Sequence, residues 1–257
     1  MDVVDEKFFN ARIVEREEIT NDLLKIRVDP GGEFNFAAGQ YATLGVVAFE
    51  KHIERAYSIV SSPYEPLVEF FVERVPEGEL TPRLHELQAG DTMSLRKSAK
   101  GRFTLETGRG PRNHLLLCTV TGIAPFVSFV RTLREDWKQG RFHGEHKLFL
   151  VHGASVSVEL GYREEMERAA ANSGWLTYVP TISRRSAEDS WKGEDGRVDD
   201  VIRKYTDLWQ LFPETTSAYL CGHPGMVGNG KGILMRHGWP KESVQEEVFF
   251  SSDKEGA

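Results

Sequence analysis

The chain has 257 residues, which gives room for two modest domains, and its 40% hydrophobic and 28% charged residues are typical of a folded globular protein. The formal net charge of −7 argues against nucleic acid as the main partner, because such partners need a surplus of Lys and Arg. No stretch has the roughly 18 apolar residues of a membrane helix, and the first residues do not read as a signal peptide. We therefore expect a cytoplasmic protein that has no membrane partner.

The content of cysteine and histidine predicts no metal site. Two cysteines, Cys118 and Cys221, are too few for a four-cysteine iron–sulfur cluster within this chain. The eight histidines are scattered, and no spacing among them resembles a set of metal ligands. We expect His143, His146 and His152 to lie on the surface or in loops.

The first half of the sequence has the pattern of an antiparallel β-barrel. From Ala11 to about Glu106, apolar and polar residues alternate, and Gly, Pro and Asp interrupt at short intervals. Only Thr81–Leu87 looks like a short helix, and many short strands with few helices favour a barrel. The expected strands are Ala11–Arg16, Leu23–Val28, Gln40–Val47, Ala56–Val60, Leu67–Val75 and Thr92–Arg96.

The second half alternates strands with helices after a polar linker at Thr107–Asn113. This rhythm predicts a doubly wound parallel sheet, whose ligands bind beyond the carboxyl ends of its strands. We expect the domains to span residues 1–107 and 113–257. The expected strands are Leu115–Val120, Lys147–Val151, Leu176–Thr181 and Ser217–Leu220, and the expected helices are Ala124–Trp137, Glu159–Ala171, Val198–Lys204 and Pro224–His237.

Two motifs in the first half suit a phosphate-containing ligand. Arg55-Ala56-Tyr57-Ser58 lies on a predicted strand, and Arg55 offers a fixed positive charge with bidentate geometry. Glu79-Leu80-Thr81-Pro82 opens the short helix, where free backbone N–H groups favour an anion. Each motif by itself is also compatible with an ordinary strand or turn.

Three motifs in the second half follow predicted strands. Thr119–Pro125 is a turn of small residues through which a flat ligand can approach the backbone. Ser183-Arg184-Arg185, with Gly196-Arg197 further on, supplies cations that suit a phosphate, although a solvated basic loop is the simpler interpretation of this segment alone. Cys221-Gly222-His223-Pro224 comes directly after the last predicted strand.

In this order and spacing the motifs resemble those of the ferredoxin–NADP reductase family, and of its bacterial branch most closely. Arg55–Ser58 matches the R-x-Y-S flavin motif, Thr121–Pro125 matches the T-G-x-A-P nicotinamide loop, and Cys221–Pro224 matches the C-G-x-P segment. The resemblance implies a monomeric flavoenzyme with FAD on the barrel and NADP(H) on the α/β domain. It would transfer hydride between them and exchange single electrons with ferredoxin or flavodoxin.

The resemblance also implies roles for single residues of the barrel. Tyr57 would lie against one flavin face, Ser58 near the flavin N5, and Phe71 would contact the flavin from the neighbouring strand. The further FAD-binding residues that it implies are Arg55, Ala56, Glu79, Leu80 and Thr81, with the pyrophosphate at Arg55, Leu80 and the backbone and hydroxyl of Thr81.

In the α/β domain, the resemblance places the 2′-phosphate of NADP at Ser183 and Arg184, with Arg185 and Arg197 beside them. Phe249 would face the second side of the flavin, with Val248 and Phe250 as alternatives. The nicotinamide pocket that it implies is lined by Thr121, Gly122, Cys221 and Gly222. The residues closest to the chemistry would be Ser58, Cys221 and Phe249.

The sequence departs from the family pattern at three places, which are the C-terminal segment around Phe249 and the two positions that follow here. Val120 stands where the nicotinamide loop usually has its first glycine, and a β-branched residue cannot take positive φ cheaply. We therefore expect that the loop shifts or that the nicotinamide sits differently. The arginine that many bacterial members carry near Ser155 is missing, so a preference for NADP would depend on Arg184, Arg185 and Arg197.

Two other functions are compatible with these motifs. One is an NADH-preferring reductase component of an oxygenase system with a separate iron–sulfur carrier. The other is a flavin-binding, non-catalytic subunit of a larger redox complex. Turnover with NADPH and with NADH separates the first from a ferredoxin–NADP reductase, and diaphorase activity with an artificial acceptor separates the second.

Overall fold

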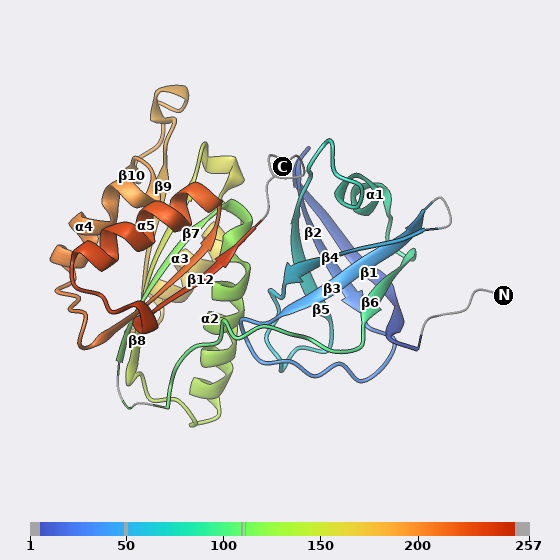
Figure 1. Cartoon of the computed structure of the whole chain (residues 1–257), viewed down its shortest axis with the longest axis horizontal. Coiled ribbons are helices and arrows are strands. Elements are labelled where there is room, and N and C mark those ends of the chain that lie inside the picture. The colour runs from blue at the N-terminus through green and yellow to red at the C-terminus, as the bar shows by residue number, and fades with distance from the viewer. Residues whose placement is uncertain (1–5, 49–50, 109, 111, 250–257) are drawn as a thin grey trace. The chain divides into compact units, whose positions relative to one another are not determined.

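The computed structural model describes residues 6–48, 51–108, 110 and 112–249, and these form two compact units (Figure 1). The first unit contains the residues up to Thr104 together with Ala124–Thr132. The second contains Leu105–Ile123 and residues 133–249. Within the described ranges, no helix is long and apolar enough to cross a membrane.

The first unit is built on a six-stranded antiparallel sheet in the order β4-β3-β6-β1-β2-β5. Its two outer strands meet, because Ile59 after β4 forms a bridge with Phe70 of β5 and the Val60 N–H donates to the Glu69 carbonyl at 2.9 Å. The sheet therefore curls on itself, and the predicted antiparallel barrel is confirmed. The elements are β1 Phe8–Thr20, β2 Leu23–Asp29, β3 Tyr41–Ala48, β4 Lys51–Ser58, β5 Val68–Glu73, α1 Thr81–Glu86 and β6 Thr92–Arg96.

The second unit is built on a six-stranded sheet in the order β10-β9-β8-β7-β11-β12, in which every neighbouring pair is parallel. The predicted parallel α/β sheet is confirmed. Apolar residues of α4 and α5 pack in one core cluster with Leu115, Leu117 and Leu220 of the central strands. The elements are β7 Arg112–Thr119, the second half of α2 Ala124–Lys138, β8 His146–Ala154, α3 Arg163–Ala171, β9 Leu176–Ile182, β10 Glu194–Asp195, α4 Val198–Leu208, β11 Thr216–Gly222, α5 Pro224–Arg236 and β12 Val244–Val248.

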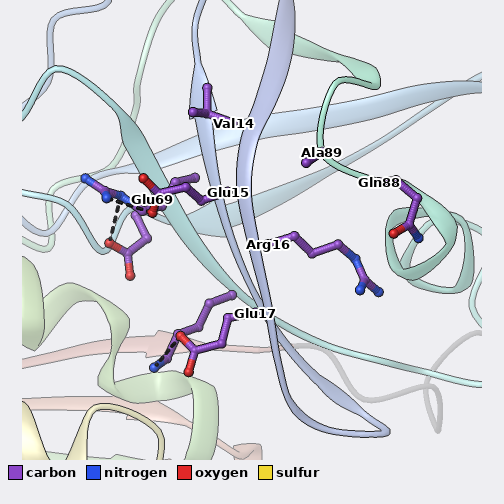
Figure 2. A pocket seen from close by; sticks show the side chains of 9 residues that line it. Val14, Glu15, Arg16, Glu17, Glu69, Gln88 and Ala89 are labelled. Atoms are coloured by element: carbon purple, nitrogen blue, oxygen red, sulfur yellow. Dashed lines mark hydrogen bonds and ion pairs between the residues drawn. The ribbon is translucent and has the colours of Figure 1, made fainter.

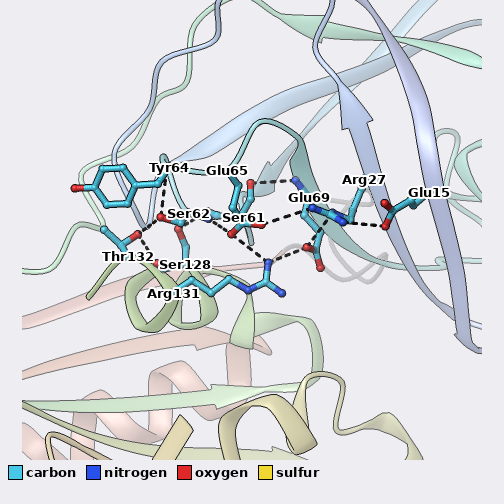
Figure 3. A network of polar contacts seen from close by, with 10 residues as sticks. All are labelled: Glu15, Arg27, Ser61, Ser62, Tyr64, Glu65, Glu69, Ser128, Arg131 and Thr132. Carbon is cyan, nitrogen blue, oxygen red and sulfur yellow. Dashed lines mark hydrogen bonds and ion pairs between the residues drawn. The ribbon is translucent and has the colours of Figure 1, made fainter. Parts of the chain in front are cut away.

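A polar network fastens the first half of α2 to the sheet of the first unit (Figure 3). The Glu69 carboxylate is 7% exposed, accepts a hydrogen bond from Arg131 at 2.8 Å and lies 3.7 Å from Arg27. The Ser128 hydroxyl donates to the Ser61 carbonyl at 2.7 Å. Burying a carboxylate costs free energy unless cations pair with it, so both arginines are needed where they lie.

Several element boundaries differ from those that the sequence predicts. β4 begins at Lys51, not at Ala56, because it pairs with β3 from Ala48 and Lys51 onward. The helix expected from Glu159 begins at Arg163, because the Glu159 carboxylate binds backbone N–H groups of the preceding turn. The strands β10 and β12 were not predicted: β10 has two residues, and β12 is largely polar because it lies at the edge of the sheet.

Two of the histidines expected on the surface are buried. His143 is exposed, but His146 is 3% and His152 is 0% exposed, because β8 is an interior strand of a parallel sheet. His114 on β7 is also buried, and its Nε2 lies 3.1 Å from His146 Nδ1. Burial lowers the pKa of His114 and of His152 to about 3, which keeps both rings neutral at pH 7.

Candidate functional site

The sheet of the second unit reverses its strand order between β7 and β11. The chain runs outward from β7 through β8 and β9 to β10, and then places β11 on the other side of β7. Open α/β sheets bind ligands beyond the carboxyl ends of the strands at such a reversal. The segments that leave β7 and β11 at this edge are Val120–Ile123 and His223–Pro224, which belong to two of the predicted motifs.

The two turns pack directly against each other. The His223 N–H donates to Thr119 Oγ1 at 2.9 Å. A Cβ atom on Gly122 would lie 2.3 Å from the Cys221 carbonyl oxygen, and one on Gly222 would lie 2.4 Å from Thr119 Oγ1. Gly222 also has a φ of 124°, a conformation that other residues avoid. Glycine is therefore required at both positions, and the structure brings these predicted residues together.

Val120 adopts a φ of 44°, which lies in the left-handed region. For a β-branched residue this conformation is an outlier that costs about 1–3 kcal/mol. The Val120 carbonyl oxygen lies 3.2 Å from His152 Nε2. Its side chain packs against a buried cluster of Ala154, Leu160, Ile182 and Trp191. These contacts offset the strain and hold the turn that continues into Thr121 and Gly122.

The predicted arginines lie beyond the ends of two neighbouring strands. Arg184 and Arg185 follow β9, Arg197 follows β10, and all three are exposed, as is Ser183. The Gly196 N–H donates to the Ile182 carbonyl at 3.0 Å, so the two segments leave the sheet side by side. Within the described part of the chain, none of the three guanidinium groups forms a salt bridge. Such groups fit a phosphate monoester.

The turn after β8, where the family arginine is missing, holds a carboxylate instead. The N–H groups of Ser155 and Val156 donate to Glu159 Oε2 at 2.9 and 3.2 Å. The N–H of Ser157 donates to Glu188 Oε1 at 2.7 Å. Hydrogen bonds from the Ser157 side chain and from this N–H lower the pKa of Glu188. Two carboxylates disfavour a phosphate at this turn. The cations that suit a phosphate at this edge of the sheet are therefore the arginines after β9 and β10.

In the first unit, cations gather at the start of α1. Arg55 is exposed and its Nη2 lies 3.4 Å from the Glu79 carboxylate, while Arg83 donates to the Glu79 carbonyl. Leu80 precedes α1 and gives it no side-chain cap, so the first backbone N–H groups lack that partner. Thr81 Oγ1 accepts from the Val75 N–H at 2.8 Å and lies 3.2 Å from the Val75 carbonyl.

This donor set fits a diphosphate. Arg55 and the open turn of α1 offer positive charge and N–H donors. The Thr81 hydroxyl donates its proton to the Val75 carbonyl, and its contact with a pyrophosphate stays a prediction. The backbone N–H groups of this turn remain as the fitting donors.

The remaining predicted flavin residues come from the two outer strands of the barrel. Tyr57 on β4 is half-buried against the core, and burial raises the pKa of its phenol, which keeps it neutral. Ser58 is 5% exposed, and Phe71 on β5 is 4% exposed. Since Ile59 and Phe70 pair, Ser58 and Phe71 come from adjoining strands. Ala56, on β4 between Arg55 and Tyr57, is exposed.

Phe249 lies next to the turn that follows β11. Its N–H donates to the Gly222 carbonyl at 3.1 Å, and Val248 pairs with Gly222 in the sheet. Val248 is 37% exposed, whereas Phe250 lies outside the described residues. Burial raises the pKa of the Cys221 thiol well above its usual value, so this thiol is neutral at pH 7.

Comparison with known proteins supports the family resemblance over most of the chain. Residues 10–105 match the family described as the oxidoreductase FAD-binding domain, and residues 116–230 match the oxidoreductase NAD-binding domain. The ferredoxin–NADP reductase A of Sorangium cellulosum is 30% identical over 255 residues, which cover 94% of this chain and 88% of that protein. The chain belongs to the ferredoxin–NADP reductase family.

Two further relatives fit this family membership. The flavodoxin/ferredoxin–NADP reductase of Escherichia coli is 32% identical over 199 residues, which cover 75% of this chain and 76% of that protein. A crystal structure of a ferredoxin NADP+ reductase from Neisseria gonorrhoeae, with bound FAD and NADP, has a TM-score of 0.82 and 27% identity, and the match covers 96% of this chain and 100% of that chain. The predicted family and its two cofactor-binding domains are confirmed.

A pocket of about 560 Å³ in the first unit contains none of the predicted flavin residues (Figure 2). It lies over β1 and β2, and most of its charged groups pair with one another, while Arg16 pairs with Glu18 beside it. Arg27 lies 2.9 Å from Glu15, and Lys25 lies 3.3 Å from Glu17. A surface whose charges already neutralise each other offers little to an anionic cofactor, so the motif residues define the site better than this pocket does.

Sequence reasoning missed the buried pair beneath the Val120 turn. His152 Nδ1 lies 3.1 Å from the Tyr178 hydroxyl, and His152 Nε2 faces the Val120 carbonyl. The signal was present in the predicted strand Lys147–Val151. Extending this interior strand by one residue buries His152, and a buried imidazole needs partners for both nitrogens.

A fall in pH from 6.5 towards 3 should destabilise the second unit, because native His152 resists protonation. Its pKa is about 3 in the native state and about 6.5 in an unfolded chain, so its contribution is complete above pH 6.5. Stability falls by about 1.4 kcal/mol per pH unit between these values for this one group. All five tryptophans lie in the second unit, so urea unfolding followed by tryptophan fluorescence measures it.

The matched variants are His152→Gln and His143→Gln. Removing the buried imidazole should flatten the pH slope by about 1.4 kcal/mol per pH unit. Removing the exposed imidazole of His143 should leave the slope as in the wild type. Equal slopes for all three proteins would contradict a neutral, buried His152.

Proposed function

We propose that the chain is a ferredoxin/flavodoxin–NADP(+) reductase, which transfers hydride between NADP(H) and FAD and single electrons to or from ferredoxin or flavodoxin. The packed turns at the β7–β11 reversal are the observation on which this proposal depends, because they combine the family's nicotinamide motifs in one place. The names of the relatives and the FAD and NADP in the Neisseria gonorrhoeae structure support it.

The first unit would hold FAD through charge at one end and shape at the other. Arg55 and the backbone of Leu80 and Thr81 would bind the diphosphate, with Glu79 as the salt-bridge partner that Arg55 leaves or shares. Tyr57 would lie along one ring face. When bound, FAD supplies a ring that accepts two electrons as hydride and releases them singly. Ala56, Ser58 and Phe71 complete the proposed FAD contacts.

The second unit would orient NADP(H) between two groups of residues. Thr121, Gly122 and Gly222 would present backbone to the nicotinamide, and the close packing of their turns excludes side chains from that surface. At the other end, Ser183, Arg184, Arg185 and Arg197 would bind the 2′-phosphate. Positioning of the reacting carbon is the main contribution that these residues make to rate.

No residue is required to act as a general acid or base in hydride transfer. The neutral Cys221 thiol would line the nicotinamide pocket without acting as a nucleophile. Phe249, which is tied by its backbone to Gly222, would cover the second face of the flavin ring and move aside for the nicotinamide. Ser58 would donate or accept a hydrogen bond at the flavin N5.

The two alternative functions are less well supported. Three arginines without salt bridges in the described chain favour a ligand that carries an extra phosphate, which NADH lacks. A non-catalytic subunit has no need for the two glycines that let the turns meet. From the names of the relatives, we propose that the partner protein is a one-electron carrier, ferredoxin or flavodoxin. We also propose that the reductase itself is a cytoplasmic monomer.

The function is tested by anaerobic titration of the purified protein. We expect a yellow protein that contains bound FAD. Its visible flavin absorbance should bleach with about one equivalent of NADPH, because two electrons pass as hydride. Bleaching with NADH should need a large excess. A protein that binds FAD but bleaches with neither nucleotide would support the non-catalytic alternative, and a preference for NADH would support the oxygenase component.

Arg184→Ala should raise the KM for NADPH far more than that for NADH. Loss of a charge-assisted contact of about 1.5–3 kcal/mol corresponds to a rise of roughly 10- to 150-fold. Steady-state diaphorase kinetics with both nucleotides measure this ratio. Arg168→Ala is the matched control, since Arg168 is an exposed arginine on α3 of the same unit, and it should change neither KM. An equal rise for NADPH and NADH would refute the 2′-phosphate assignment.

Arg55→Ala should weaken FAD binding by roughly 10- to 150-fold for the same energetic reason. Flavin content after gel filtration and the Kd from fluorescence titration of the apoprotein measure the effect. Arg12→Ala removes an exposed arginine from β1 of the same sheet and should retain full flavin content. If Arg55→Ala also retains its flavin, Arg55 is not a ligand of the pyrophosphate.

A further inference from the structure

The Val120 carbonyl fixes the tautomer of His152. A carbonyl oxygen only accepts, so His152 Nε2, at 3.2 Å, carries the proton and donates it. His152 Nδ1 therefore has a free lone pair and accepts from the Tyr178 hydroxyl at 3.1 Å. The result is a directed chain of hydrogen bonds from Tyr178 through His152 to the backbone of the turn.

Both donors in this chain keep their protons at neutral pH. Burial lowers the pKa of His152 to about 3 and raises that of Tyr178 well above its usual value. His152 is fully buried, so no water competes for its two nitrogens. These hydrogen bonds therefore have a single arrangement, in which His152 holds the peptide that follows Val120 by its carbonyl oxygen.

The turn needs such a restraint because its residue is valine. With a φ of 44°, Val120 lies in a region that β-branched side chains disfavour, and it would relax towards negative φ if released. Relaxation would turn the Val120 peptide and displace Thr121 and Gly122, which follow it directly. A glycine at this position would hold the same φ without help.

We propose that His152 and Tyr178 are positioning residues, which hold the strained Val120 turn and thereby set the affinity of the second unit for the nicotinamide half of NADP(H). This inference rests on the proposed function, since it takes the turn as part of the dinucleotide site. It assigns a role to a residue pair on β8 and β9 that need not touch the ligand at all.

Tyr178→Phe removes only the hydroxyl group that donates to His152 Nδ1. We expect the Kd for NADP+ of the FAD-containing protein, measured by isothermal titration calorimetry, to rise about 3- to 10-fold, the size expected for one hydrogen bond. The Kd for 2′,5′-ADP, which lacks the nicotinamide half, should stay within about 2-fold. An equal rise for both ligands, or no rise for either, would overturn the proposal.

Val120→Gly separates a positioning role from simple loss of stability. In the glycine background the turn keeps its conformation unaided, so adding Tyr178→Phe should change the Kd for NADP+ by less than about 2-fold. His152→Gln should rescue most of the affinity that His152→Leu loses, because the amide can still donate to the Val120 carbonyl. If Tyr178→Phe raises the Kd for NADP+ by the same factor in the valine and the glycine background, the positioning role is refuted.

The control for loss of a buried phenol is Tyr219→Phe. The Tyr219 hydroxyl accepts from the Glu106 N–H at 2.9 Å, so its removal also leaves an unpaired group in the second unit. This variant should lower stability without changing the Kd for NADP+ in either the valine or the glycine background. A rise equal to that of Tyr178→Phe would show that general destabilisation is the cause.

A ligand-independent measurement separates failure of this inference from failure of the proposed function. Long-range ¹H–¹⁵N NMR spectra of the histidine rings report which nitrogen of His152 is protonated. A proton on Nε2 in the wild type and in Tyr178→Phe, with a change in the ¹⁵N shift of Nδ1 when the variant removes its hydrogen-bond donor, supports this arrangement. A proton on Nδ1 overturns it whatever the protein binds, whereas a wild type with the Nε2 tautomer that binds no NADP+ refutes the proposed dinucleotide site.

Discussion

Parallel pairing of β7 with both β8 and β11 is the constraint on which the candidate site depends. Because the three strands run in one direction, their carboxyl ends reach one edge of the sheet, and the turns after β7 and β11 must share the space there. They fit only because Gly122 and Gly222 lack side chains, as any Cβ would overlap with the opposing turn. The surface that results is backbone, which suits a planar ring better than a cluster of side chains does.

Buried polar groups hold the parts of each unit that carry the motifs. In the first unit, Glu69 needs Arg27 and Arg131, and this pairing fixes the first half of α2. In the second unit, His152 has a partner at each ring nitrogen and holds a backbone conformation that valine disfavours. Hydrogen bonds of this kind add little net stability, but removal of one partner is costly, so they specify position more than they stabilise.

Sequence pattern predicted both sheets and the position of the motifs at strand ends, because alternation and the strand–helix rhythm are local properties. It could not predict which strands are interior, and so placed His152 on the surface. It also could not show that the Thr81 hydroxyl bonds to Val75, because that partner comes from a turn outside the motif. Val120 was noticed as unusual, but the restraint that makes it possible comes from β8 and β9, far away in sequence.

The distribution of charge explains how a protein with a net charge of −7 can select an anionic nucleotide. Glu159 occupies the turn after β8. The arginines that would bind the 2′-phosphate lie beyond β9 and β10, on one side of the sheet reversal. The Val120 turn lies at the reversal itself and carries no charge. In the proposed assignment, recognition of the phosphate and placement of the nicotinamide therefore depend on separate segments. A substitution in one should alter cofactor preference, and a substitution in the other should alter affinity for both nucleotides alike.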